Sequence, residues 1–509
     1  MLVVYVCQAG CPAGMSSKTV QNSFLMTECP ARNGSTPRSA RKSAECCEKQ
    51  PLFERTAATQ PVRLTPAWEE NNLPSDELNF KAVTMERADL EMNPPSDRLN
   101  LVYLTLLLHG IGTLLPWNMF ITANDYFAKF KFSEEYTGRK LDYVTNFLNY
   151  LGFAAQVPSF LFNWLNIFVQ IKGSLTTRIV WSISIEVLVF ILTVILAMCD
   201  SSEWPDAFFW ITIISFVILN MANGVYQNSV FGMAAKLPFK YTGVVILGTN
   251  VSGTFTAIIN LFSSIMAPNA RTAAIYYFIT ALFVLLACFD TYFALPLSRF
   301  YRYHELLYEK ELQLKKRNNQ NVLPTTPYFT ILSQCLMQCF NVFFIFFVTL
   351  AIFPTMHASI KKYDENFFVS EALYANIMCF LTFNAFALIG SLLSTLGSWP
   401  QPKYMVVPVV ARALFIPFFL LCNYVPANVE RALPVLVTSD WAYWLGAVAM
   451  AVTSGYFSAV AMMYVSGSVE PQYAATAGMF GSAFLITGIL AGVIFSLLMP
   501  GIATISWFQ

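Results

Sequence analysis

Three features of the sequence predict an all-α polytopic membrane protein. The chain has 509 residues, of which 56% are hydrophobic and only 12% are charged, whereas a soluble domain carries about 25% charged residues. The apolar residues form long runs, each close to the roughly 20 residues that a helix needs to cross the hydrocarbon core. Helices are expected because lipid cannot satisfy exposed backbone groups, and the alternating pattern of barrel strands is absent.

Eleven of these runs are long enough to form transmembrane helices. Their approximate limits are 99–123, 143–170, 178–199, 206–231, 242–266, 274–297, 329–354, 370–396, 404–424, 440–465 and 474–499. Two of them contain small residues four positions apart, Gly248 to Ser252 and Gly488 to Gly492. Such spacing allows the backbones of two helices to approach closely, so we interpret both patterns as packing surfaces.

A polar stretch from Ser298 to Thr326 divides the runs into six and five. It contains the basic residues Arg299, Arg302, Lys310, Lys315, Lys316 and Arg317. Because basic residues accumulate in cytoplasmic loops, we expect this stretch to lie inside the cell. The predicted parts are a cytoplasmic tail over 1–97, a six-helix bundle over 98–297, a cytoplasmic central loop over 298–328 and a five-helix bundle over 329–509.

The two ends of the chain are expected on opposite sides of the membrane. Residues 1–97 are rich in Ser, Pro, Glu and Arg, a composition typical of disorder, and we place them in the cytoplasm. An odd number of spans then puts the C-terminus outside. The bias of basic residues toward the inside is modest, because the first outer loop holds Lys129, Lys131, Arg139 and Lys140.

The sequence gives no sign of an enzyme. Neither an HExxH nor a GxSxG motif is present, and the 11 cysteines do not have metal-site spacing. We therefore predict no catalytic residue, no metal site and no cofactor. The formal net charge of +1 gives no general attraction to nucleic acid. No obligate protein partner is evident either, and the expected surroundings are membrane lipids.

Polar side chains inside the apolar runs mark candidate binding positions. Asn220, Asn223 and Gln227 follow an i, i+3, i+7 pattern and share one helical face. Facing lipid would be costly for them, so they should line a cavity or another helix. Pro116 removes a helix hydrogen bond just before Trp117 and Asn118. An aromatic face and an amide suit a nucleoside, but a kinked helix with its amide bonded to a neighbouring helix is the alternative.

Short motifs on successive runs resemble the equilibrative nucleoside transporter family over about residues 99 to 498. They are Gly110-Ile-Gly-Thr-Leu-Leu-Pro-Trp-Asn118, Tyr226-Gln-Asn-Ser-Val-Phe-Gly232, Phe380-Leu-Thr-Phe-Asn384 and Ala411-Arg-Ala-Leu-Phe-Ile-Pro417. The resemblance implies eleven transmembrane helices, six plus five, in a fold similar to the major facilitator type.

The resemblance also implies a function. The expected activity is sodium-independent facilitated diffusion of nucleosides, such as adenosine and uridine, with alternating access at the plasma membrane. The alternative is a related carrier for another small substrate, such as an organic cation or a nucleobase, with or without proton coupling. The expected substrate-binding residues lie between the two bundles: Leu114, Trp117, Asn118, Gln156, Gln227, Asn384 and Ile489.

The chain departs from the family pattern at several positions. Ala387 and Ser391 stand where the family usually has an aspartate and an arginine. Gln156 stands where family members have an apolar substrate-lining residue, which makes that wall more polar. Two acids, Glu186 and Asp290, lie in apolar runs. Glu186 is a candidate for proton coupling or cation selectivity, with a satisfied structural carboxylate as the alternative, and Arg412 is a candidate partner for these acids.

Overall fold

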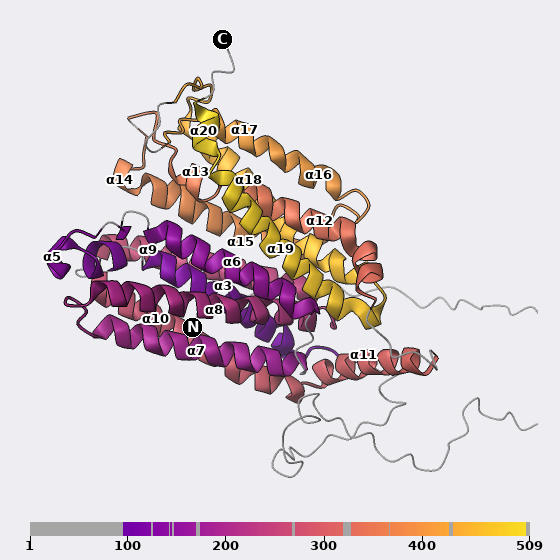
Figure 1. Cartoon of the computed structure of the whole chain (residues 1–509). Coiled ribbons are helices and arrows are strands. Elements are labelled where there is room, and N and C mark those ends of the chain that lie inside the picture. Colours follow the sequence, from indigo (N-terminus) through magenta and orange to yellow (C-terminus); the bar gives the residue numbers. More distant parts are fainter. Residues whose placement is uncertain are drawn as a thin grey trace, which may run out of the picture. The chain divides into compact units, whose positions relative to one another are not determined.

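The computed structural model describes residues 95–123, 126–141, 143–144, 147–168, 174–266, 270–318, 327–365, 367–426 and 431–504. The tail expected over 1–97 lies almost wholly outside these residues. The principal helices are α3 (Leu101–Thr122), α6 (Phe147–Phe168), α7 (Leu175–Met198), α8 (Pro205–Ala234), α9 (Lys240–Met266), α10 (Ala270–Ala294), α12 (Tyr328–Ile352), α15 (Thr382–Leu396), α18 (Asp440–Gly467) and α19 (Ala474–Ser496). Figure 1 shows their arrangement.

Each of the eleven predicted runs is helical in the described part of the chain, and nine helices are long and apolar enough to cross a membrane. The other two runs form α6, whose 22 residues include several amides, and a shorter apolar segment, Val406–Leu420. That segment consists of α16 (Val406–Ala411), η6 (Arg412–Leu414) and α17 (Phe415–Leu420). The full count of eleven crossings therefore stays a prediction.

Glycines bring helix backbones into contact within each half of the chain. A Cβ atom added to Gly248 of α9 would lie 2.2 Å from the carbonyl oxygen of Leu107 in α3. One added to Gly488 of α19 would lie 2.4 Å from the carbonyl oxygen of Phe343 in α12. Both distances are far below van der Waals contact, so only glycine fits. The two small-residue patterns are thus packing surfaces, as the sequence predicted.

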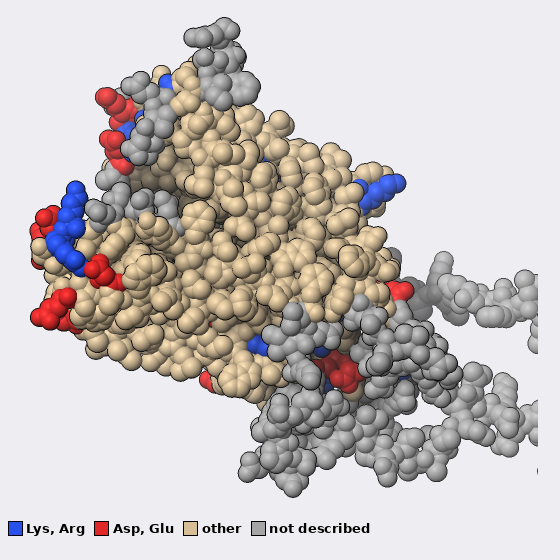
Figure 2. Space-filling model, viewed as in Figure 1, with Lys and Arg blue, Asp and Glu red and all other residues tan. Residues whose placement is uncertain are grey.

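Contacts also join the two halves. Helix α9 packs against α15 and α18, while α19 packs against α6 and α8. On the face shown in Figure 2, charged side chains gather toward the ends of the helices, and most of the surface between them is uncharged. This pattern is expected where lipid covers the sides of a helical bundle.

The polar stretch between the halves contains a helix that the sequence analysis did not predict. Helix α11 spans Arg299–Asn318, and its first turn buries Phe300 and Tyr301. The ring of Tyr308 lies 4.9 Å from the ammonium of Lys236, at the end of α8. The stretch is rich in Glu, Leu, Lys and Arg, which favour helices. Its lack of a long apolar run excluded a membrane span but did not exclude a helix.

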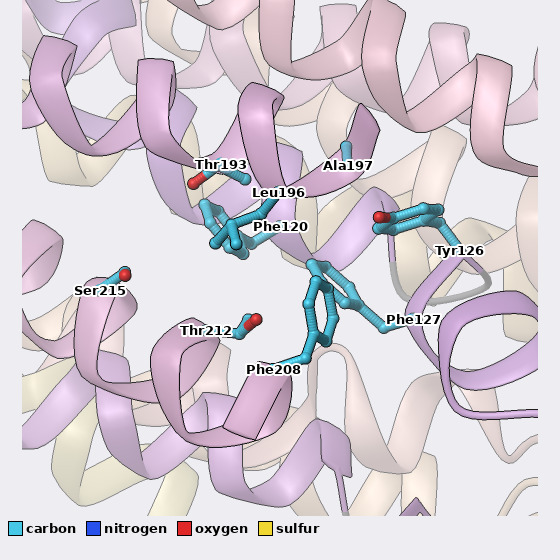
Figure 3. Close-up of a pocket in the computed structure, with 9 residues that line it drawn as sticks. All are labelled: Phe120, Tyr126, Phe127, Thr193, Leu196, Ala197, Phe208, Thr212 and Ser215. Carbon is cyan, nitrogen blue, oxygen red and sulfur yellow. The ribbon is translucent and has the colours of Figure 1, made fainter. Parts of the chain in front are cut away.

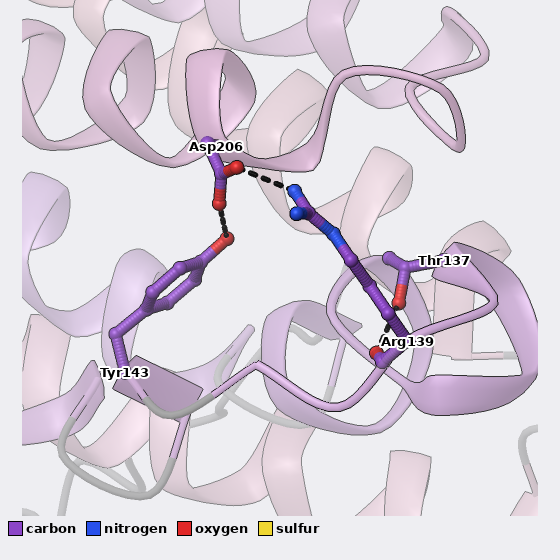
Figure 4. Close-up of polar contacts among 4 residues, drawn as sticks. All are labelled: Thr137, Arg139, Tyr143 and Asp206. Atoms are coloured by element: carbon purple, nitrogen blue, oxygen red, sulfur yellow. Dashed lines mark hydrogen bonds and ion pairs between the residues drawn. The ribbon is translucent and has the colours of Figure 1, made fainter.

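Basic residues of the first outer loop bind the loop to the end of α7 and the start of α8. The ammonium of Lys131 donates to the carbonyl oxygen of Cys199 at 2.6 Å and to the hydroxyl of Ser201 at 3.3 Å. Burial lowers the pKa of Lys131. Arg139 and Tyr143 both donate to Asp206 in the first turn of α8 (Figure 4). These contacts give a structural reason for basic residues in a loop that is expected outside the cell.

Candidate substrate site

Helix α9 contacts two of the predicted site residues, one from each half of the chain. The amide of Asn118 in α3 donates to the hydroxyl of Ser252 at 3.3 Å. Two residues along α9, the hydroxyl of Thr254 donates to the backbone oxygen of Asn384 at 2.8 Å. A Cβ atom on Gly253 would lie 2.2 Å from the Asn384 side-chain oxygen. One turn of α9 therefore lies between Asn118 and Asn384.

The contact between Asn118 and Ser252 is an interhelical bond, which the sequence left as the alternative to a substrate contact. The bond to Ser252 does not prevent Asn118 from contacting a substrate as well, because the side chain is only half-buried and an amide has several hydrogen-bonding positions. Helix α3 continues through Pro116 rather than ending there. The hydroxyls of Ser252 and Thr254 were missed as site candidates, since a single Ser or Thr in an apolar run usually bonds to its own helix.

The aromatic part of the predicted site belongs to the first half. The ring of Trp117 stacks on that of Phe216 in α8, with centroids 6.4 Å apart and planes 22° apart. Leu114, one turn earlier in α3, is half-buried. The indole thus has one face against a ring of its own bundle.

Gln227 and Gln156 come from α8 and α6, which pack closely against each other. A Cβ atom on Gly224, three residues before Gln227, would lie 2.8 Å from the carbonyl oxygen of Ser159. Gln227 is buried, whereas Gln156 is half-buried. Ile489 of α19 is also half-buried and packs against the core that α8 and α19 share. The grouping of all seven residues around one substrate stays a prediction.

Next to Gln227 lies a buried network of amides that joins the halves. The amide of Asn228 donates to the side-chain oxygen of Asn163 in α6 and to the carbonyl oxygen of Met479 in α19, both at 2.8 Å. Asn166 donates to the side-chain oxygen of Asn228 at 2.8 Å. Asn163 itself donates to the hydroxyl of Ser482 in α19 at 3.1 Å. Polar residues on α6 and α8 are thus satisfied across the boundary between the halves.

Glu186 lies inside the first half of the chain. Its side chain is completely buried in α7, and neither carboxylate oxygen has a hydrogen-bond partner among the described residues. Elsewhere in this half, the hydroxyl of Tyr226 lies 2.7 Å from Nδ1 of the buried His109. By contrast, Asp290 of α10 is exposed and lies about one turn before the end of that helix at Ala294, close to the edge of the span.

The expectation that Arg412 pairs with one of these acids is wrong. Arg412 is buried in the second half, where its guanidinium donates to the carbonyl oxygen of Met450 at 3.1 Å and to the hydroxyl of Thr349 at 2.8 Å. A further bond goes to the hydroxyl of Thr453. Neutral oxygens of α12 and α18 therefore hold this cation. Sequence pattern could not show that, because it does not specify which helix faces the arginine.

The two positions that lack the family's charged pair are tightly enclosed. Ala387 has 2% of its surface exposed and Ser391 has none. A Cβ atom added to Gly455 of α18 would lie 1.9 Å from the carbonyl oxygen of Ala387. The hydroxyl of Ser391 donates to the carbonyl oxygen of Leu388 at 2.9 Å, within its own helix. Small neutral residues here permit close contact between α15 and α18.

Two cavities in the described part of the chain lie outside the predicted site. The first lies among aromatic and hydroxyl side chains of α3, α7 and α8, including Phe120, Thr193 and Ser215 (Figure 3). Its volume of about 10 Å³ leaves room for roughly one water molecule. The second has a volume of about 440 Å³ and lies where α3, α9, α15 and α18 meet. Neither cavity is lined by any of the seven predicted residues.

Comparisons with known sequences find similarity to nucleoside transporters. A sequence profile described as "Nucleoside transporter" matches residues 213–500. Human equilibrative nucleoside transporter 1 is 30% identical over 454 residues, which cover 80% of this chain and 98% of the relative. Human equilibrative nucleoside transporter 2 is 29% identical with the same coverage, and rat equilibrative nucleoside transporter 3 is 28% identical over 78% of this chain and 88% of its own.

Solved structures give the fold class. The proton:xylose symporter XylE of the major facilitator superfamily, bound to 6-bromo-6-deoxy-D-glucose, aligns with a TM-score of 0.58 and 10% sequence identity. The alignment covers 81% of this chain and 90% of the symporter. At this identity the similarity concerns the fold alone, and it confirms the expected likeness to the major facilitator type.

Proposed function

The chain belongs to the equilibrative nucleoside transporter family, and we propose that it carries nucleosides across the membrane by facilitated diffusion. One structural observation supports this proposal most directly. Asn118 and Asn384, from opposite halves of the chain, flank the same turn of α9. Amides at such a boundary can donate to and accept from base edges and ribose hydroxyls. No chemical step is needed, so the concentration gradient supplies the driving force.

The proposed mechanism is alternating access around a site between the halves. Transporters of this type rock one bundle against the other about a site near the membrane midplane. Two sets of contacts between the halves would separate alternately during this motion. One set joins α9 to α15 and α18, and the other joins α19 to α6 and α8. The bonds from Asn228 to Met479 and from Asn163 to Ser482 would have to break when that side opens.

Uptake measurements test the proposed function. Cells or proteoliposomes containing the full chain should accumulate labelled adenosine or uridine down a gradient without sodium. The same preparations should be offered an organic cation and a nucleobase at pH 5.5 and pH 7.4. Uptake of the cation or nucleobase without nucleoside uptake would replace the proposal with the related-carrier alternative.

Gln227→Ala is expected to reduce nucleoside uptake at least about fivefold at substrate concentrations well below saturation. The reason is the loss of one substrate hydrogen bond, which costs about 1 kcal/mol or more. Surface expression should stay near normal. Asn220→Ala is the matched control, because the Asn220 amide donates to the carbonyl oxygen of Phe216 in the same helix at 2.8 Å. Equal uptake by the Gln227 variant and the unmodified chain would remove Gln227 from the site.

Glu186→Gln is expected to leave uptake nearly unchanged at both pH values. A buried carboxylate without hydrogen-bond partners is more readily held as the neutral acid, and glutamine has a similar shape. The enclosed position of Glu186 in the first half favours a structural role over cation selectivity. The measurement is adenosine uptake as a function of pH. Loss of a pH dependence that the unmodified chain shows would instead establish proton coupling through Glu186.

We propose a plasma-membrane location, with the N-terminus inside the cell and the C-terminus outside. The basic residues of α11, including Arg299 and Arg302, support an inner position for the connection between the halves. Epitope tags placed within residues 319–326 and after Gln509 should be accessible from opposite sides of intact cells. Accessibility from the same side would rule out the eleven-span arrangement.

A further inference from the structure

The larger cavity has the features of a ligand site separate from the proposed transport site. Its volume is about 440 Å³, and it lies between the start of α3 and α9 from the first half and the ends of α15 and α18 from the second. Lys240 opens α9 only four residues after Lys236, which contacts Tyr308 of α11. The cavity is therefore at the same end of the helices as α11, the end proposed to face the cytoplasm.

The lining offers one cation and several neutral hydrogen-bonding groups. Lys240 is exposed, its ammonium lies 5.2 Å from the ring centroid of Tyr241, and no acidic side chain of the described residues forms an ion pair with it. Ser398, after the end of α15, supplies a hydroxyl, whereas those of Ser394 and Thr395 already donate to carbonyl oxygens of their own helix at 2.7 Å. Ammonium and hydroxyl groups together are suited to a phosphate group.

The acid beside this cavity is already engaged. The carboxylate of Asp97 accepts hydrogen bonds from the backbone N–H of Val102 at 3.2 Å and of Tyr103 at 3.0 Å. It also accepts one from the hydroxyl of Tyr241 at 3.0 Å. With its oxygens directed to these donors, Asp97 fixes the start of α3 and leaves Lys240 as the cavity's unpaired charge among the described residues.

Apolar side chains next to the cavity are strongly exposed. Leu104 follows Tyr103 in α3 and is 52% exposed, while Leu396 follows Thr395 in α15 and is 84% exposed. Phe239, which itself lines the cavity, is 54% exposed. In a membrane protein, a charged pocket bordered by such residues lies where lipid headgroups meet acyl chains. A small water-soluble anion would make no use of these apolar neighbours.

We propose that this cavity binds the headgroup of an anionic phospholipid. Its phosphate would contact the ammonium of Lys240 and the hydroxyl of Ser398, and its acyl chains would lie along Leu104 and Leu396. Because the cavity is formed by both halves, the bound lipid would stabilise the arrangement of α3 and α9 against α15 and α18 that forms it. This inference concerns a lipid site and does not depend on which substrate is carried.

Thermal unfolding of the purified full-length chain in detergent micelles tests the proposal. Phosphatidylserine should raise the unfolding temperature in a saturable manner, and phosphatidylcholine should raise it less. Lys240→Gln should raise the half-saturating phosphatidylserine concentration about fivefold, as expected for one lysine beside an anionic lipid. Lys403→Gln is the matched control, because Lys403 is exposed, contacts the neighbouring ring of Tyr404 and does not line the cavity.

A second variant covers the case in which Lys240→Gln does not fold. Ser398→Phe changes an exposed position and narrows the cavity without removing charge, so it should also weaken the phosphatidylserine response. Equal responses in the Lys403 and Lys240 variants would overturn the site, since they would indicate general charge attraction. An equal effect of water-soluble glycerophosphoserine would overturn the assignment to a lipid. Because the readout is lipid-dependent stability, a failure of nucleoside uptake would leave this result unaffected.

Discussion

Ala387→Asp should abolish most surface expression and lower the free energy of unfolding by at least about 3 kcal/mol. The position is almost fully buried where α15 meets α18. An ionised carboxylate there would lack a cation, and such a charge within a membrane costs roughly 3 kcal/mol even on the lower scales. Arg412 is already bonded to oxygens of α12 and α18. Surface labelling and thermal unfolding of the solubilised protein measure the effect.

Two further variants separate charge from size. Ala387→Val adds bulk without charge, so any loss it shares with Ala387→Asp comes from crowding of α15 against α18. Ser391→Arg combined with Ala387→Asp restores both family residues on one helical face, four positions apart. Part of the loss should then be recovered, because neither charge is left without a partner. Strictly additive losses in the double variant would show that the two positions do not interact.

Asn228→Leu is expected to lower both stability and transport. Leucine has a similar size but removes the bonds to Asn163 and Met479, and it leaves the amide of Asn166 with only the hydroxyl of Ser229 as its side-chain acceptor. Each buried polar group left unpaired costs about 1 to 3 kcal/mol. Because the Met479 bond joins α8 to α19, its loss also changes the balance between conformations. Thermal unfolding and the saturation curve of adenosine uptake would register the two effects separately.

Asn341→Leu provides the comparison for Asn228→Leu. Asn341 is equally buried, but its amide donates to the side-chain oxygen of Gln338 in the same helix at 3.0 Å. Its replacement should therefore cost less and leave uptake by the folded protein unchanged. If the two leucine variants behaved alike in both assays, the amide network would have no special role between the halves.

The sequence by itself determined the helical membrane fold and the approximate limits of its helices. The run predicted over 440–465 is α18, Asp440–Gly467, and the run over 242–266 is α9, Lys240–Met266. The agreement has a simple cause, because a chain in lipid must satisfy its backbone internally and a span needs a minimum apolar length. The motifs on these runs were also sufficient to indicate the family.

Only the tertiary structure decided which side chains meet. Hydrophobic periodicity predicts a shared face for Asn220, Asn223 and Gln227, but it does not name the helix opposite that face. Asn163 bonds to Ser482, more than 300 positions away, and Arg412 bonds to neutral oxygens rather than to an acid. Such pairs depend on how whole helices cross. Local sequence sets the length and polarity of a helix, whereas its partners are fixed by close packing against residues distant in the chain.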